Sequence, residues 1–163
     1  MQMWPVRVVV FLLVGGMLTG CQIARQHETP AQPPAERDVR EEFWPNGQLH
    51  VRTEFVRGDD ETWLKDGVYT EWYEDGQKCA EVHYVRDKLD GVMTRWHPNG
   101  QMHVERHYRN GLRHGRTRIW DEKGHLRKEE FHFEGQPDGT WTTWKTDGSI
   151  RHRQQFQRGE SVP

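Results

Sequence analysis

The sequence predicts an all-β fold, an elongated single-layer antiparallel meander of about five β-hairpin repeats of about 24 residues each. Tryptophans recur with a constant spacing, at Trp72, Trp96, Trp120 and Trp144. Glycines recur in phase, five residues before each tryptophan and again four residues after it, at Gly76, Gly100, Gly124 and Gly148. Such a period is typical of units that bury their apolar side only against neighbouring units. Hydrophobic residues are 33% of the chain and mean hydropathy is -1.03, which favours a thin core without a second layer.

Each unit reads as two strands joined by a tight turn. The hairpin dipeptides are Asp75-Gly76, Asn99-Gly100 and Asp147-Gly148, and Asn110-Gly111 marks a turn at the other end of the unit. A two-residue loop would place Trp72 opposite Cys79, whereas a three-residue loop with a left-handed glycine places Trp72 opposite Lys78. We favour the second register, a type I turn plus bulge, because it also pairs Trp96 with Met102, Trp120 with Leu126, Trp144 with Ile150 and Phe43 with Leu49.

This register predicts a sheet with one apolar face and one wet face. The tryptophans would lie on the apolar face. The wet face would carry Glu81, Glu105 and Glu129, together with Arg95, Arg127 and His103. The first unit begins at Phe43 and is irregular, because five extra residues displace it around Gly58 to Trp63.

The N-terminal residues indicate a targeting segment rather than a repeat. An apolar run of about 11 residues after Arg7 is too short to cross a bilayer of ~30 Å. It ends at Leu18-Thr19-Gly20-Cys21, which resembles the lipobox of bacterial lipoproteins, where the cysteine is acylated and becomes the N-terminus. We therefore expect a lipoprotein signal peptide at 1–20, a flexible tether at 21–41 and the repeat domain at 42–163. The expected location is the bacterial cell envelope, lipid-anchored and extracytoplasmic, on the inner or the outer membrane.

Candidate chemistry is sparse, and we expect no enzyme activity and no cofactor. If Cys21 carries lipid, Cys79 has no partner for a disulfide. His107 and His114 are the most plausible metal pair, but zinc needs three or four ligands, so no metal site is predicted. The sequence contains no phosphate-binding loop, nucleophile elbow or zinc-protease motif.

Charge is distributed unevenly along the chain. Residues 41–90 hold 13 acids and 6 bases, residues 91–128 hold 3 acids and 9 bases, and residues 129–163 hold 6 acids and 4 bases. The predicted basic zone comprises Arg95, Arg106, Arg109, Arg113, Arg116 and Arg118. It could bind an acidic partner, either a protein or an anionic envelope component, or it could simply help acidic and basic repeats pack. Nucleic acid is not expected, because export removes the protein from it and aromatic residues do not interleave with the basic ones.

The pattern from Gly91 to Tyr108, with Trp96, Asn99-Gly100 and Glu105 at fixed offsets, resembles the bacterial variant of the MORN repeat (membrane occupation and recognition nexus). This repeat type occurs in a family of toxin–antitoxin antitoxins, and the resemblance extends over about 43 to 159 of the chain. It implies β-hairpins laid side by side. For function it implies binding, scaffolding or membrane association without catalysis.

Together these features predict a non-enzymatic, membrane-anchored extracytoplasmic protein that acts as a protein-binding or scaffolding module. One alternative is an antitoxin-like or immunity-like partner that neutralises a toxin, and another is a structural spacer. The oligomeric state is left open, and end-to-end dimers are one option, because a meander has two edges.

Overall fold

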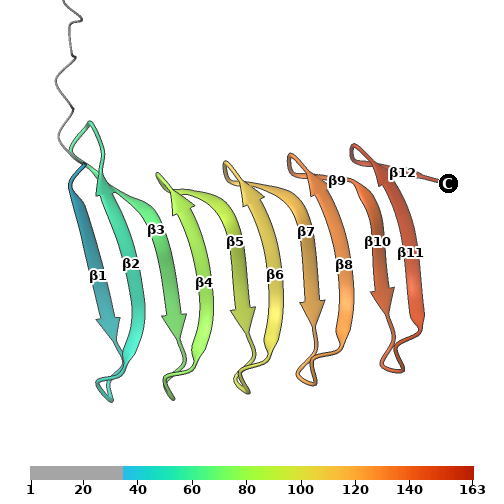
Figure 1. Ribbon diagram of the computed structural model, residues 1–163, viewed down its shortest axis with the longest axis horizontal. Coiled ribbons are helices and arrows are strands. Elements are labelled where there is room, and N and C mark those ends of the chain that lie inside the picture. The colour runs from blue at the N-terminus through green and yellow to red at the C-terminus, as the bar shows by residue number, and fades with distance from the viewer. Residues whose placement is uncertain (1–34) are drawn as a thin grey trace, which may run out of the picture. The chain divides into compact units, whose positions relative to one another are not determined.

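The structure, a computed structural model, describes residues 35–163, which form one open antiparallel sheet (Figure 1). The strands are β1 (Arg37–Phe43), β2 (Leu49–Arg57), β3 (Trp63–Trp72), β4 (Lys78–Val85), β5 (Lys88–Trp96), β6 (Met102–Arg109), β7 (Leu112–Trp120), β8 (Leu126–Phe133), β9 (Gln136–Pro137), β10 (Gly139–Trp144), β11 (Ile150–Gln157) and β12 (Glu160–Val162). Each strand pairs with its neighbours in the chain, except that β8 pairs with both β9 and β10. The predicted all-β meander is confirmed. The predicted signal peptide, Cys21 and the tether up to residue 34 lie outside the described residues.

Five hairpins form the sheet, namely β1–β2, β3–β4, β5–β6, β7–β8 and β10–β11. Their turns lie along the lower rim in Figure 1, which we call the turn rim. In the second hairpin, the Gly76 N–H donates to the Tyr73 carbonyl at 2.9 Å and the Tyr73 N–H donates to the Gln77 carbonyl at 2.8 Å. Gly76 has a φ of 85°, so this is the type I turn with a left-handed glycine that the sequence predicts. The register that places Trp72 opposite Lys78 is also confirmed, as are the four equivalent pairs.

Successive hairpins are connected along the opposite rim, which we call the link rim. The first connection has five residues, from Gly58 to Thr62, and the later ones are two-residue turns. At the predicted turn Asn110-Gly111 both residues are left-handed, with φ of 50° and 84°, as a type I′ turn requires. The Gly111 N–H donates to the Leu89 carbonyl at 2.8 Å, so the turn contacts the first strand of the hairpin before it. The Asn110 N–H donates to the Asp90 carboxylate at 3.0 Å. Each such turn therefore ties three strands together.

A second β-bulge lies beside every hairpin turn, in addition to the bulge that the sequence predicts at the turn itself. Glu71 pairs with Ala80 and Trp72 pairs with Lys78, so Cys79 is an extra residue on β4. The extra residues, here called bulge residues, are His50, Cys79, His103, Arg127 and Arg151.

These bulges reverse part of the predicted face assignment. Thr70 pairs with Glu81, and Thr70 lies two residues before Trp72 on an uninterrupted strand. Glu81 therefore lies on the same face as Trp72, and Glu105 and Glu129 follow the same pattern. The prediction that the glutamates lie opposite the tryptophans is wrong, because one inserted residue exchanges the two faces of the rest of the strand.

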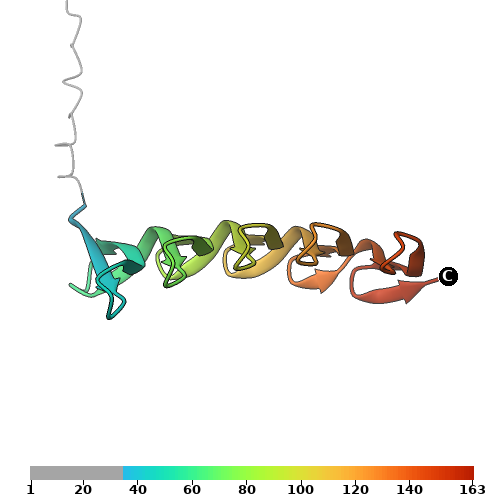
Figure 2. The same ribbon diagram turned by 90° about the horizontal axis from the view of Figure 1, so that it is seen from below.

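The core consists of small side chains on the face opposite the tryptophans, which we call the valine face. It includes Val51, Ala80, Val82, Val104 and Thr117, all buried. The four repeat tryptophans lie on the other face, the tryptophan face, and each is only half-buried. The indoles therefore share one face as predicted, but the most buried packing is aliphatic. The hairpins are curved rather than flat (Figure 2).

A continuous row of paired residues crosses the tryptophan face. This row, called the charge row, consists of Glu41, Arg52, Thr70, Glu81, Thr94, Glu105, Arg118, Glu129, Thr142 and Arg153. Arg118 lies between two acids, 2.9 Å from Glu129 and 4.0 Å from Glu105. Opposite charges on neighbouring strands stabilise a sheet, whereas like charges would oppose pairing.

The sheet starts earlier than the repeat pattern predicts. β1 begins at Arg37, so residues 37–41, which the sequence analysis placed in the tether, pair with β2. The sequence of residues 37–41 is mostly charged and does not alternate apolar and polar residues, so it does not predict a strand. These residues are extended because they pair with β2. Within residues 35–163 there is no helix with the length and apolar character needed to cross a membrane.

Candidate functional site

In each hairpin the side chain of the first turn residue lies near that of the bulge residue. Four of these couples are in contact, and the fifth couple lines one pocket. We call each such pair a rung. The five rungs are Trp44 with His50, Tyr73 with Cys79, His97 with His103, Asp121 with Arg127, and Lys145 with Arg151. In the first rung the ring centroids lie 3.8 Å apart, and in the third they lie 4.1 Å apart. Burial, followed by the contact with Cys79, raises the pKa of the Tyr73 hydroxyl.

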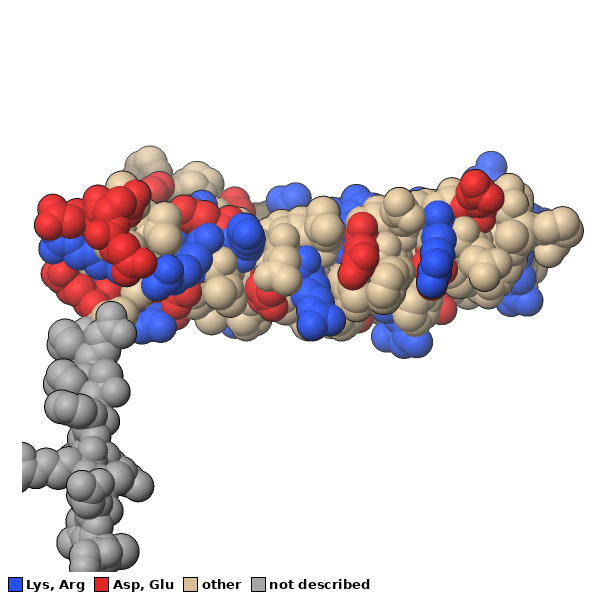
Figure 3. Space-filling view, turned by 90° about the horizontal axis from the view of Figure 1, so that it is seen from above, with Lys and Arg blue, Asp and Glu red and all other residues tan. Residues whose placement is uncertain are grey.

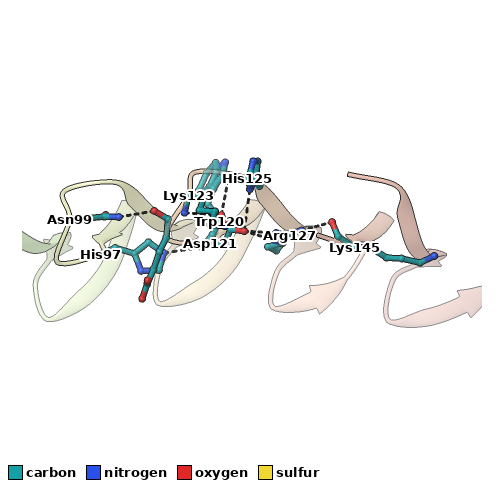
Figure 4. A network of polar contacts seen from close by, with 9 residues as sticks. His97, Asn99, Trp120, Asp121, Lys123, His125, Arg127 and Lys145 are labelled. Atoms are coloured by element: carbon teal, nitrogen blue, oxygen red, sulfur yellow. Dashed lines mark hydrogen bonds and ion pairs between the residues drawn. The ribbon is translucent and has the colours of Figure 1, made fainter. Parts of the chain in front are cut away.

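The first three rungs also reach the next hairpin. Trp44 Nε1 donates to the Trp72 carbonyl at 3.1 Å, and Tyr73 Oη donates to the Trp96 carbonyl at 2.7 Å. His97 Nε2 lies 3.1 Å from the Trp120 carbonyl and must donate to it, because a carbonyl only accepts (Figure 4). Three different side chains therefore make the same connection to a backbone acceptor.

In the fourth rung the first turn residue is Asp121, and its carboxylate cannot donate a hydrogen bond to the next hairpin. Arg127 Nε donates to Asp121 Oδ2 at 2.8 Å, and Arg127 also donates to the Lys145 carbonyl of the next hairpin (Figure 4). Asp121 accepts the backbone N–H groups of Lys123 and His125 at 3.0 and 2.9 Å. Desolvation acts to raise the pKa of Asp121, but these hydrogen bonds and Arg127 outweigh it and hold the pKa below its usual range.

The fifth rung is different from the others because both members are cations. Lys145 and Arg151 are exposed, and neither makes an ion pair with another residue in the described part of the chain. They line a pocket of about 970 Å³ between the fourth and fifth hairpins. The lining residues of this cationic pocket are Ile119, Arg127, Lys128, Thr143, Trp144, Lys145, Thr146 and Arg151.

The pocket combines unneutralised charge with an apolar wall. Asp121 neutralises Arg127, and Glu130 neutralises Lys128, so Lys145 and Arg151 supply the free positive charge. Ile119 and Trp144 supply apolar surface, and two threonines supply hydroxyl groups. Such a pocket suits an oxyanion attached to an apolar group, because a guanidinium and an ammonium can both donate to its oxygens.

The predicted basic zone is not gathered on one face. Arg118 belongs to the charge row, and Arg116 lies two residues away on the same face. Arg106, which pairs with Thr117, lies on the valine face. Arg95 lies there too, paired with Val104, and Arg109 ends β6 at the link rim.

Three of these arginines already have acidic partners. Arg113 lies 3.9 Å from Glu130, and Arg116 and Arg118 lie 3.5 and 2.9 Å from Glu129. Acidic and basic side chains alternate along much of the surface in Figure 3, while acidic ones gather over the N-terminal hairpins. A binding role for the zone stays a prediction, and its ion pairs agree with the alternative in which the charges help the hairpins pack.

The histidine pair considered for a metal is not brought together. A register shift after Arg106 leaves His107 within a bulge, where its Nδ1 lies 2.9 Å from the Arg116 carbonyl. The His114 ring instead packs against Phe133, with centroids 5.0 Å apart. Among residues 35–163 no three histidine, cysteine or acidic side chains lie close enough to hold a metal ion.

Two groups of residues were missed by sequence reasoning. Lys145 and Arg151 were not selected, although their alignment with Asp121 and Arg127 shows a like-charged pair once the bulge is known. The link-rim aspartates Asp66, Asp90 and Asp138, which accept backbone N–H groups of the link turns, were also missed. Their signal was available, since each directly precedes a glycine of the repeat.

Comparison with protein families identifies two of the hairpins. The model of the MORN repeat variant matches residues 65–86 and 89–110, which cover most of β3 and β4 and then β5 and β6. No curated protein matches the chain. MORN repeats are generally protein-binding or membrane-binding modules, and their all-β fold is typically non-catalytic.

Proposed function

We propose that this chain is a non-enzymatic binding or scaffolding module that is anchored to a bacterial envelope membrane through Cys21 and holds an acidic protein partner in the cationic pocket. The observation that carries the binding role is the fifth rung. Lys145 and Arg151 face the same pocket without an acidic partner in the described residues, whereas every other rung is neutral or charge-compensated.

The chemistry of the pocket favours an acidic protein segment. A carboxylate could accept from both Lys145 and Arg151, while a neighbouring apolar side chain contacts Ile119 and Trp144. The sheet supports such a role, because in residues 35–163 no second layer covers either face. An acidic segment could therefore reach the pocket without a rearrangement of the fold.

Capture experiments test the binding role. The wild-type chain, purified in detergent, is used as bait and compared with a pocket variant that carries both Lys145→Glu and Arg151→Glu. The matched control combines Lys88→Glu with Lys123→Glu, which changes net charge equally at exposed lysines that make no ion pair with a described residue. We expect the pocket variant to lose the partner and the control to retain it, with weaker capture at high salt because exposed charges are screened.

Two results would oppose this role. Equal loss in both variants would mean that only net charge matters, and unchanged capture by the pocket variant would place the contact elsewhere. If the captured partner is toxic alone and harmless beside this chain, the toxin-neutralising function replaces scaffolding.

The anchor is tested separately. Metabolic labelling with a fatty acid should mark the chain and fail with Cys21→Ala, because the lipobox cysteine is the proposed acylation site. If the Cys21→Ala chain is still labelled, Cys21 is not the acylated residue and the proposed anchor is refuted, while the proposal for the cationic pocket is unaffected.

A further inference from the structure

The geometry points to head-to-tail association, in which the open edge of β11 pairs with β1 of a second copy of this chain. Among the described residues β1 pairs only with β2. β11 pairs with β10 over most of its length, but with β12 only at Gln155, Phe156 and Gln157. The half of β11 from Ile150 to Gln154 therefore has backbone groups on its outer side without a strand partner in residues 35–163. Such edges are templates for another strand.

The interior of the sheet defines how such a strand would align. Wherever one hairpin meets the next, the residue after the bulge residue pairs with the residue before the repeat tryptophan. These pairs are Val51 with Glu71, Ala80 with Arg95, Val104 with Ile119, and Lys128 with Thr143. The register is constant across all four junctions, so it is a property of the repeat.

The same rule aligns the two ends of the sheet. Phe43 takes the tryptophan position in the first hairpin, and Arg151 is the bulge residue of the last. His152 would therefore face Glu42 of the second copy, and Arg153 would face Glu41. This register places the Arg153 guanidinium beside the Glu41 carboxylate, which is a favourable charge pair.

Continuity of the charge row supports this alignment. The row begins at Glu41 and ends at Arg153, so stacking two copies would place Arg153 beside Glu41. Within one copy, Glu41 already lies 3.8 Å from Arg52 on its other side and keeps 44% of its side chain exposed. Glu41 would then lie between two arginines. Arg118 has the same arrangement with the charges exchanged, because it lies between two glutamates.

The ends are also complementary in backbone. β12 occupies the link-rim half of the β11 edge, where interior repeats have the start of their first strand. Arg40–Phe43 of a second copy would occupy the remaining half. In the same register Arg37–Val39 of that copy would fall opposite Gln155–Gln157, where β12 already pairs, so β12 or this short segment must move aside when the two copies join. Arg151 in this half of β11 also lines the cationic pocket. The pairing uses the β11 backbone and the His152 and Arg153 side chains, which do not line the pocket, so the inference does not require the proposed partner.

Site-specific cross-linking tests the register directly. In the full chain in detergent, Glu42→Cys combined with His152→Cys should give a ladder of disulfide-linked multimers on mild oxidation. The control, Glu41→Cys with His152→Cys, places the thiols on opposite faces and should give few. Both variants also carry Cys21→Ala, so Cys79 is the one native thiol left, and it is buried and adds little background. Equal ladders in both variants, or none in either, would overturn the proposal.

A charge exchange tests the contact without cysteines. Arg153→Glu alone and Glu41→Arg alone should each weaken self-association roughly 5-fold, measured by sedimentation over a concentration series. The chain carrying both changes should recover the original association, because the two substituted side chains of successive copies would again carry opposite charges. A wild-type chain that stays monomeric throughout the series, or a double variant no better than the singles, would refute head-to-tail pairing.

Discussion

Removing the Tyr73 hydroxyl tests whether the rungs hold neighbouring hairpins together. In the structure Tyr73 Oη donates to the Trp96 carbonyl at 2.7 Å, and this bond links the second hairpin to the third. A neutral hydrogen bond contributes about 1 kcal/mol to stability. Tyr73→Phe keeps the ring against Cys79 and removes only the donor, so we expect the free energy of unfolding to fall by about 1 kcal/mol. For a domain of this size that lowers the melting temperature by roughly 3–5 °C.

The chain offers a matched control in Tyr69. Its hydroxyl lies 3.5 Å from the Glu71 carboxylate, too long for a strong hydrogen bond. Burial, followed by the nearby Glu71 charge, raises the pKa of Tyr69 to about 12, so the phenol is neutral in both the folded and the unfolded chain near neutral pH. Tyr69→Phe should therefore change stability by less than about 0.5 kcal/mol.

Urea unfolding followed by tryptophan fluorescence measures both variants. The hairpins contact only their neighbours, so weakening one junction should lower cooperativity as well as the midpoint, and both the slope and the midpoint should be compared. If Tyr73→Phe is no less stable than Tyr69→Phe, the rung contributes nothing and the argument for the turn rim fails.

Two further predictions concern pH and backbone strain. Burial lowers the pKa of both His103 and His132 in the folded protein, so the unfolded chain binds more protons just below its value of about 6.5. Stability should therefore be full above about pH 6.5 and fall as the pH drops toward the folded pKa, and the urea midpoint at about pH 7.5 and about pH 5.5 checks this. Gly91 has a φ of 108° and an added Cβ would lie 3.3 Å from the His83 Cβ, whereas Gly148 has a φ of 83° and open space around it. Gly91→Ala should thus cost about 1–3 kcal/mol and more than Gly148→Ala, and equal losses would show that the contact is unimportant.

The repeat, its turns and the pairing beside each turn could be predicted because they depend on local sequence. Gly76 and Asp75 specify a turn by conformation alone, and the turn then determines that Trp72 faces Lys78. The position of β1 could not be predicted, since the charged residues 37–41 become a strand only by pairing with β2.

The face assignment failed for a physical reason. The bulge at Cys79 carries no glycine or proline, and its equivalents are histidines and arginines, so no residue type marks it. One extra residue moves Glu81 to the other face. The candidate site depends on the same detail, because only the bulge makes Lys145 and Arg151 partners in one rung. Long-range register, rather than composition, therefore determines where the free charge lies.

The acceptors of the rungs suggest how a molecule of this kind could change in length. Each connection across the turn rim ends on a main-chain carbonyl, at Trp72, Trp96, Trp120 or Lys145. An indole, a phenol and an imidazole meet the equivalent carbonyl of the next hairpin, and a guanidinium meets the carbonyl one residue later. A donor therefore does not have to match the identity of its new neighbour. Duplication or loss of one whole hairpin would leave every remaining junction compatible, and the sheet could grow or shrink in steps of about 24 residues without compensating substitutions.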